Sequence, residues 1–128
     1  NKVLSITGDG NQTRDFVHVD DVVEAFSVGA FAPLVPGSNR VFNVGTGEEI
    51  SVLAIVRLLE QVSGVKVTTV FASAADDREP SRSVADVTMS RRHLGFSAQV
   101  QVSDGLRRVW NAMRDAMPSA IEESRLCS

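Results

Sequence analysis

Arg14 is the residue of this sequence best suited to bind a charged ligand. It follows a tight-turn signal at residues 8–11, which read Gly-Asp-Gly-Asn, and it lies in an extended piece at residues 13–19. The planar guanidinium of arginine donates two parallel hydrogen bonds to a phosphate or diphosphate, which suits that group better than the point charge of lysine. The alternative is an ion pair with a surface carboxylate such as Asp15, and spacing alone favours this alternative.

The elements that must position Arg14 are predicted from the hydrophobic pattern. Strands are expected at residues 3–6, 13–19, 41–44 and 65–71. Helices are expected from Asp20 or Asp21 to before Pro33, from Ser51 to Gly64, over residues 88–94, and from Ser103 to Pro118. The polar segment 72–82 between them is predicted to be a loop that function can use. Alternating strands and helices predict an α/β fold, or α+β if the first strands pair antiparallel.

Side chains at the helix starts predict how the helices begin. Asp21 with Glu24 three residues later approximates a capping box, and Ser51 and Ser103 are candidate N-caps for their helices. The last helix is expected to turn one apolar face inward, which comprises Leu106, Val109, Trp110, Met113 and Met117.

Composition excludes several classes of function. The 128 residues fit one domain, with 43% hydrophobic and 23% charged residues and a net charge of −3. This balance, with scattered basic residues, predicts neither a nucleic-acid partner nor an anionic membrane partner. The single cysteine, Cys127, excludes an internal disulfide framework and a thiolate metal site, so a reducing cytoplasm is expected.

The chain has no apolar stretch near the roughly 20 residues that span a bilayer, and no leader resembling a signal peptide. It begins at Asn1 without an initiator methionine, directly before a predicted strand. We therefore expect an internal fragment of a longer protein.

Three ordered blocks resemble the extended short-chain dehydrogenase/reductases, the family of NAD-dependent nucleotide-sugar epimerases and dehydratases. Residues 8–21 resemble the block Gly-Asp-Gly-x-Gln-x-Arg-Asp-Phe-Val-His-Val-x-Asp, and residues 42–47 read Phe-Asn-Val-Gly-Thr-Gly. Residues 83–96 resemble a third block that contains Ala-Asp and ends in Leu-Gly and an aromatic residue. The resemblance covers nearly the whole chain and is to proteins of the UDP-glucose 4-epimerase type. It implies an α/β, C-terminal substrate-binding part that lacks most of the N-terminal Rossmann domain.

The resemblance also implies roles for single residues. Arg14 would contact the diphosphate of a nucleotide-diphosphate sugar, Asp21 would cap its helix, and His18 would pack in the core. Asn43 is expected to fix the turn that contains Gly45 and Gly47 through side-chain-to-backbone bonds. Asp86 would cap the short helix at residues 88–94.

The loop before Ser83 departs from the family pattern. There the family has an arginine that closes a second clamp on the phosphates, whereas an ungapped match places Asp76 at that position. Two aspartates and no cation would suit a phosphate poorly. A two-residue deletion would make Arg78 the clamp residue, which we prefer, with Arg82 as the substitute.

The parts that carry the family's chemistry are missing from this sequence. In the family that the sequence resembles, hydride transfer uses NAD bound on a glycine-rich Rossmann turn, and a tyrosine four residues before a lysine takes a proton from the sugar hydroxyl. The chain has no tyrosine, only two lysines, Lys2 and Lys66, and no Gly-x-Gly-x-x-Gly pattern. We therefore expect no catalytic residue and no metal ligand here. Residues 1–118 would form a partial substrate domain that needs the Rossmann domain as partner, and residues 119–128 a flexible tail.

Two further hypotheses stay open from the sequence. The chain could be a non-catalytic module that binds nucleotide sugars, or a structural remnant that forms a homo-oligomer through its uncovered apolar face. Within the enzyme class, epimerase, 4,6-dehydratase, decarboxylase and reductase are not separated, because the residues that distinguish them would lie upstream.

Overall fold

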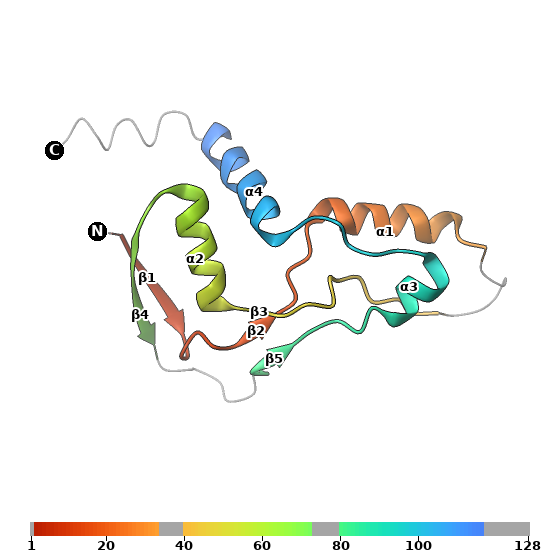
Figure 1. Ribbon diagram of the computed structural model, residues 1–128, viewed down its shortest axis with the longest axis horizontal. Coiled ribbons are helices and arrows are strands. Elements are labelled where there is room, and N and C mark those ends of the chain that lie inside the picture. The colour runs from red at the N-terminus through yellow and green to blue at the C-terminus, as the bar shows by residue number, and fades with distance from the viewer. Residues whose placement is uncertain (1, 34–39, 73–79, 117–128) are drawn as a thin grey trace.

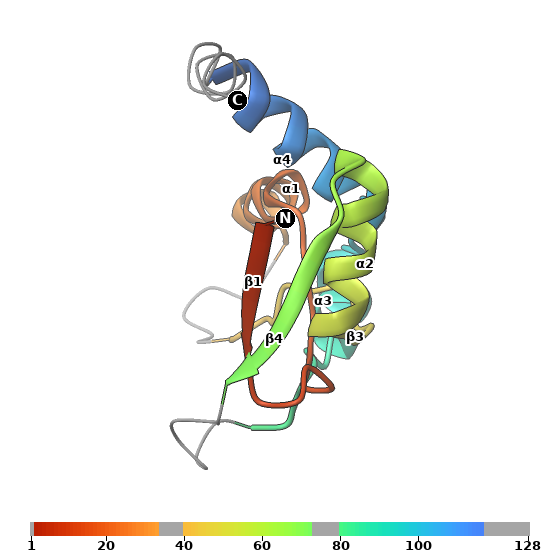
Figure 2. The same cartoon turned by 90° about the vertical axis from the view of Figure 1, so that its left-hand side faces the viewer.

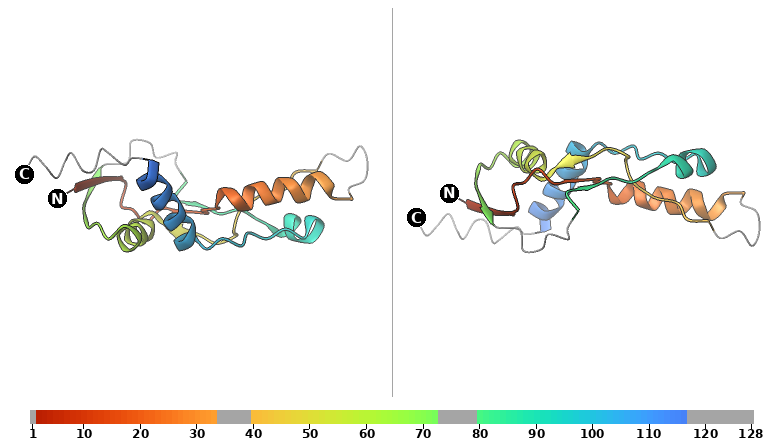
Figure 3. Two further views of the ribbon diagram at one scale, coloured as in Figure 1. Left: turned by 90° about the horizontal axis from the view of Figure 1, so that it is seen from above. Right: turned by 90° about the horizontal axis from the view of Figure 1, so that it is seen from below.

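The computed structural model describes residues 2–33, 40–72 and 80–116. The elements in chain order are β1 (Lys2–Thr7), β2 (Thr13–Arg14), α1 (Val19–Phe31), β3 (Ile50–Ser51), α2 (Val52–Ser63), β4 (Val67–Ala72), β5 (Arg82–Ser83), α3 (Thr88–Leu94) and α4 (Val102–Ala116). Figure 1 shows an elongated molecule, with β1, β4 and α2 towards one end, α1 and α3 at the other, and the short strands between them. The views from above and below show the same separation (Figure 3).

The two long strands form a parallel pair. β1 runs beside β4, with Lys2 opposite Val67 and Thr7 opposite Ala72, and α2 lies alongside them (Figure 2). β1 does not pair antiparallel with β2, which removes the α+β alternative, since a parallel pair needs a crossover connection such as the one that contains α2. The mixed α/β fold predicted from the sequence is confirmed.

The short strands form a second sheet in the order β3-β2-β5. β2 pairs antiparallel with β3 and parallel with β5, so that Arg14 lies opposite Ile50 on one side and Ser83 on the other. The turn after β1 leads into this sheet and is joined to the start of α2, because the carbonyls of Gly10 and Gln12 accept the N–H groups of Leu53 and Val52, each at 3.1 Å. Only residues 13 and 14 of the extended piece predicted at 13–19 belong to a strand.

Local signals place α2 and α3 where the sequence predicts them. The Ser51 hydroxyl accepts the N–H of Ala54 at 3.2 Å, which caps α2, and Gly64 ends that helix in the left-handed conformation. Gly95 ends α3 in the same way. The prediction for Ser103 is wrong: it lies inside α4, which begins at Val102.

The strand predicted at residues 41–44 is absent from the structure. These residues have no strand partner within the described ranges, and Val41 is 86% exposed. A short apolar run becomes a strand only where a neighbour supplies the ladder hydrogen bonds, so the pattern alone was insufficient here.

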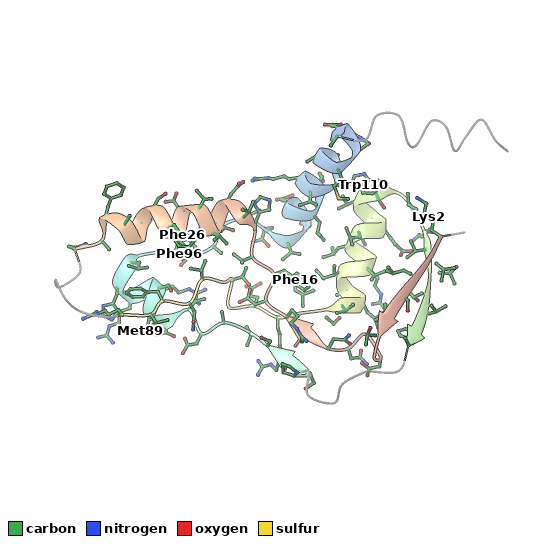
Figure 4. The ribbon with its side chains drawn as sticks, turned by 180° about the vertical axis from the view of Figure 1, so that it is seen from behind. Lys2, Phe16, Phe26, Met89, Phe96 and Trp110 are labelled. Carbon is green, nitrogen blue, oxygen red and sulfur yellow. The ribbon has the colours of Figure 1, made fainter. Side chains whose placement is uncertain are left out.

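The buried core is small in the described part of the chain. Its apolar members are Ile6, Ala25, Val56, Val87 and Phe96. Figure 4 shows Phe96 and Phe26 between α1 and α3, yet Phe26 is 75% exposed and Phe31 at the end of α1 is 89% exposed. Apolar exposure of this size marks a surface suited to further contacts.

The inward face predicted for α4 is only partly covered. Trp110 is half-buried where α4 packs against α2 (Figure 4), whereas Val109 and Met113 are 49% and 57% exposed. The prediction is therefore wrong for Val109 and Met113. Met117 lies outside the described residues, as do the whole predicted tail at 119–128 and the last two residues of the 1–118 unit.

Candidate functional site

The guanidinium of Arg14 lies at the junction of β2 and the segment that leads into β5. Its Nη1 donates to the Thr13 carbonyl at 2.8 Å and to the Pro80 carbonyl at 3.0 Å. The side chain is half-buried. These bonds hold one edge of the planar group against the backbone, which limits the positions that the guanidinium can take.

An open hollow of about 590 Å³ lies beside Arg14. It is lined by side chains of α1 and by residues of the segments 14–15, 42–44 and 83–86. The lining includes Arg14, Asp15, Phe26, Phe42, Asn43 and Asp86. The volume is within the range of sites that bind small molecules, and the lining pairs aromatic surface with a few polar groups, as such sites do.

Asp15 is the centre of the hydrogen bonds around this hollow. Its Oδ1 accepts the Thr46 N–H at 2.9 Å and the Thr46 hydroxyl at 2.6 Å, while Oδ2 accepts the N–H groups of Gly47 at 2.9 Å and Ala85 at 3.3 Å. One carboxylate therefore joins the segment after β2 to the turn at 45–47 and to the segment after β5. The sequence indicates Asp15 only as an ion-pair partner for Arg14, so this role was not predicted.

The charge state of Asp15 follows from the same contacts. Burial raises the pKa of its carboxyl, but the hydrogen bonds from Thr46, Gly47 and Ala85 together outweigh burial and hold the pKa below the ordinary value of 3.8. Asp15 is therefore ionised at neutral pH, and its negative charge is met by four donors.

Gly45 and Gly47 are both required by this arrangement, for different reasons. A Cβ at Gly45 would lie 2.6 Å from the Asp15 Oδ2 and 2.7 Å from the Ala85 Cβ, so a side chain at Gly45 would displace the carboxylate. Gly47 has a φ of +77°, a conformation that glycine adopts without steric cost. The turn can approach Asp15 closely only because these positions have no side chain.

Asn43 does not fix the glycine turn, contrary to the prediction. Its Nδ2 donates to the Asp86 carbonyl at 3.0 Å, and its own carbonyl accepts the hydroxyl of the fully buried Ser90. Asn43 thus joins its segment to the start of α3. The partner of the turn is Asp15, which is far from it in the sequence.

Asp86 lies next to the first turn of α3. Its Oδ1 accepts the Thr88 N–H at 2.9 Å, although the N-cap position itself is held by Val87. The side-chain and backbone hydrogen bonds from Thr88 lower the pKa of the Asp86 carboxyl. Asp86 therefore adds a negative charge to the lining of the hollow.

Asp21 is not the cap of α1, and this prediction is wrong. The cap is His18, whose Nδ1 accepts the Asp20 N–H at 3.1 Å and whose side chain is only 12% exposed. Asp21 is 5% exposed and accepts the N–H groups of Gln99 at 2.8 Å and Val100 at 3.1 Å. It is a buried structural tie between α1 and the segment before α4.

The two candidates for a second phosphate clamp have different outcomes. Arg78 lies outside the described residues. Arg82 is placed on β5, where its Nε donates to the Glu49 Oε2 at 2.6 Å. This contact raises the pKa of Arg82 and, together with a hydrogen bond from Thr13, lowers the pKa of Glu49. In this structure the charge of Arg82 is met by Glu49.

The described residues do not fit the pyrophosphate of NAD. A Rossmann turn passes from a strand into a helix whose N-terminus faces the phosphates. The glycine turn at Gly8 and Gly10 follows β1 but leads into β2. Within the same residues, no group of three or more His, Cys, Asp or Glu side chains could hold a metal ion, and no helix is long and apolar enough to cross a membrane.

Comparison with known proteins shows the family to which the chain is related. Residues 1–109 match the family described as GDP-mannose 4,6 dehydratase. The chain is 36% identical to the UDP-glucose 4-epimerase of Mycolicibacterium smegmatis, over 89% of this chain and 35% of that protein. It is 35% identical to an uncharacterized UDP-glucose epimerase of Bacillus subtilis, over 82% of this chain and 32% of that protein.

The fold is shared with solved epimerases. The UDP-glucuronic acid 4-epimerase of Bacillus cereus, in complex with UDP-glucuronic acid and NAD, superposes with a TM-score of 0.81 at 32% identity, over 90% of this chain and 36% of that one. The UDP-glucose 4-epimerase of Thermotoga maritima with UDP-glucose gives 0.80 at 31% identity, over 89% and 35%. The fold and the matched motifs define a class of nucleotide-sugar enzymes.

Within that class, the chain belongs to the extended short-chain dehydrogenase/reductases and to the GDP-mannose 4,6-dehydratase family. It spans about a third of the length of the relatives that it matches.

Proposed function

We propose that this chain is the substrate-binding part of a nucleotide-sugar epimerase that resembles UDP-glucose 4-epimerase. The observation that carries the proposal is the position of Arg14, a restrained guanidinium at the edge of a hollow large enough for a small molecule. The names of the relatives support the ligand class, since both crystal structures described above are complexes with UDP sugars.

In this proposal Arg14 binds the diphosphate and Asp15 keeps the surrounding backbone in place. Two parallel N–H donors on one rigid group match two phosphate oxygens. The carboxylate of Asp15 lines the hollow with Arg14 and is fixed by hydrogen bonds from the turn at 45–47 and from Ala85, so the hollow is formed before the ligand arrives. A site formed in advance loses less entropy on binding and presents the sugar in one orientation.

The redox chemistry of the proposed reaction is NAD-mediated oxidation and reduction at a sugar carbon. The described residues do not fit that cofactor, and the sequence has no tyrosine to act on a sugar hydroxyl. We therefore propose that a separate nicotinamide-binding Rossmann domain supplies this chemistry and that the present chain alone does not turn over substrate.

Replacing Arg14 by alanine should weaken UDP-glucose binding by the full chain roughly ten- to a hundredfold, because charge-assisted hydrogen bonds contribute about 1.5–3 kcal/mol. Isothermal titration calorimetry measures the change. Arg107→Ala is the matched control, since Arg107 is an exposed arginine of α4 that pairs with Asp104. Equal affinities of wild type and Arg14→Ala would refute the assigned role of Arg14.

The matching family favours a second candidate, the corresponding part of a 4,6-dehydratase that acts on a GDP sugar. The same titration with GDP-mannose distinguishes the two, because an epimerase part should prefer UDP-glucose. A third candidate is a non-catalytic nucleotide-sugar-binding module. A module of this kind would bind UDP-glucose equally well with and without an added nicotinamide-binding domain, and the mixture would not turn over the sugar.

A further inference from the structure

We infer that Glu49 is a positioning residue for Arg14, and that it acts by fastening β5 to β2. This inference rests on the proposed function, because it assigns a support to the proposed diphosphate-binding arginine. The observation is that one carboxylate oxygen, Glu49 Oε2, accepts the Thr13 hydroxyl at 2.8 Å and the Arg82 Nε at 2.6 Å. Thr13 and Arg82 are directly opposite each other in the parallel ladder of β2 and β5.

Glu49 thereby connects all three strands of the short sheet. It immediately precedes β3 in the sequence, and its carboxylate reaches one residue of β2 and one of β5. Each of these strands has only two residues, far fewer than the five or six of an ordinary strand. With so few ladder hydrogen bonds, the side-chain contacts at Glu49 are a large share of what fixes the register.

The register in turn determines where Arg14 lies. The Nη1 of Arg14 donates to the Pro80 carbonyl, and Pro80 directly precedes the residue whose carbonyl accepts the Thr13 N–H at 2.9 Å. Pro80 therefore moves with β5. If β5 separates from β2, Arg14 loses its hydrogen bond to the Pro80 carbonyl, which is one of the contacts that restrain its guanidinium.

The charges at this point favour the same role. Removing Glu49 removes the carboxylate that pairs with Arg82. The positive charge of Arg82 would then lie on β5 next to β2, the strand that carries Arg14. The contacts are near the surface, since the side chains of Arg82 and Glu49 are 67% and 35% exposed. Exposed ion pairs contribute little to global stability, so the effect of losing Glu49 should be local to β2 and β5.

The test is Glu49→Gln in the full chain, with Glu48→Gln as the matched control. Glu48 is the neighbouring exposed glutamate. Two signals are read by nuclear magnetic resonance without ligand: hydrogen exchange of the Thr13 amide and the Nε–H resonance of Arg14. Glu49→Gln should accelerate Thr13 exchange roughly three- to tenfold, the effect of weakening charge-assisted bonds, and shift the Arg14 resonance. The β1–β4 amides serve as an internal reference.

The same variants are then titrated with UDP-glucose. Glu49→Gln should raise Kd by a similar factor. When Arg82→Gln is combined with Glu49→Gln, the change in binding free energy should differ from the sum of the two single changes, as expected for residues in contact. An unchanged Arg14 resonance, or faster Thr13 exchange with unchanged Kd, would overturn the positioning role. If wild type does not bind UDP-glucose, the proposed function fails, while the two ligand-free signals still decide whether Glu49 places Arg14.

Discussion

Asp15→Asn should lower the free energy of unfolding by about 2–4 kcal/mol. The carboxylate of Asp15 accepts four hydrogen bonds from Thr46, Gly47 and Ala85. An asparagine keeps one oxygen and replaces the other by an NH₂ group, so that at least one backbone N–H would face another donor. Asparagine has nearly the same shape as aspartate. The lower free energy of unfolding is therefore due to the lost hydrogen-bond acceptor and not to a change in packing.

Urea unfolding followed by the fluorescence of Trp110, the single tryptophan, measures this change. Asp115→Asn is the control, because Asp115 is an exposed aspartate of α4 that makes only a loose 3.8 Å contact with Arg114. The control should alter stability by less than about 0.5 kcal/mol. If the two variants unfold at the same urea concentration, Asp15 does not have the role assigned to it.

The pH dependence of the free energy of unfolding, compared between wild type and Asp15→Asn, gives a second test. The pKa of Asp15 in the folded chain lies below 3.8, so its contribution is complete above that value and is lost as the pH falls through the folded-state pKa. The stability difference between wild type and Asp15→Asn should therefore be greatest at neutral pH and shrink in acid. A difference that grows as the pH falls would have the wrong sign for an ionised acceptor.

Gly45→Ala should destabilise the chain by about 1–3 kcal/mol, the usual cost of forcing extra atoms into a packed position. The new methyl group would lie 2.6 Å from the Asp15 Oδ2 and 2.7 Å from the Ala85 Cβ. It is confined on both sides, so it must displace the carboxylate, the segment after β5, or both. We expect weaker UDP-glucose binding as well, because the hollow beside Arg14 shares these walls.

Gly29→Ala is the matched control for this substitution and should have the opposite sign. Gly29 is within α1, and an added Cβ would meet nothing within 4 Å. Alanine in a helix interior is favoured over glycine by about 0.5–1 kcal/mol. In thermal unfolding, the melting temperature of Gly45→Ala should therefore lie below that of wild type, and that of Gly29→Ala should lie above it. A melting temperature of Gly45→Ala at or above that of wild type would contradict the crowded geometry at Asp15.

The elements that sequence analysis located correctly are those specified by neighbouring residues. Ser51 and Gly64 bound α2 because a cap and a left-handed glycine act within one turn of the helix. Gly95 ends α3 for the same reason. The candidate Arg14 also emerged from its local motif, and the structure places it in a hollow together with Asn43 and Asp86.

The interactions that sequence analysis missed join residues far apart in the chain. Asp15 binds Ala85, Asp21 binds Val100, and Arg82 binds Glu49. No short-range pattern distinguishes such a carboxylate from a helix cap or a surface charge, because the partner is known only after the chain has folded. One signal was present for Asp15: a turn with two glycines needs an external acceptor for its N–H groups, and Asp15 is adjacent to the candidate Arg14.

A nuclear magnetic resonance titration of the full chain with UDP-glucose tests whether the hollow beside Arg14 binds a nucleotide-diphosphate sugar. We expect saturable shifts of the Arg14 Nε–H resonance and of the amides of Thr46, Gly47 and Ala85, which donate to the Asp15 carboxylate in the wall of the hollow. UDP should reproduce the shift at Arg14, and glucose should not. Saturable shifts confined to other parts of the chain, or none at ligand concentrations that saturate an intact epimerase, would contradict the account.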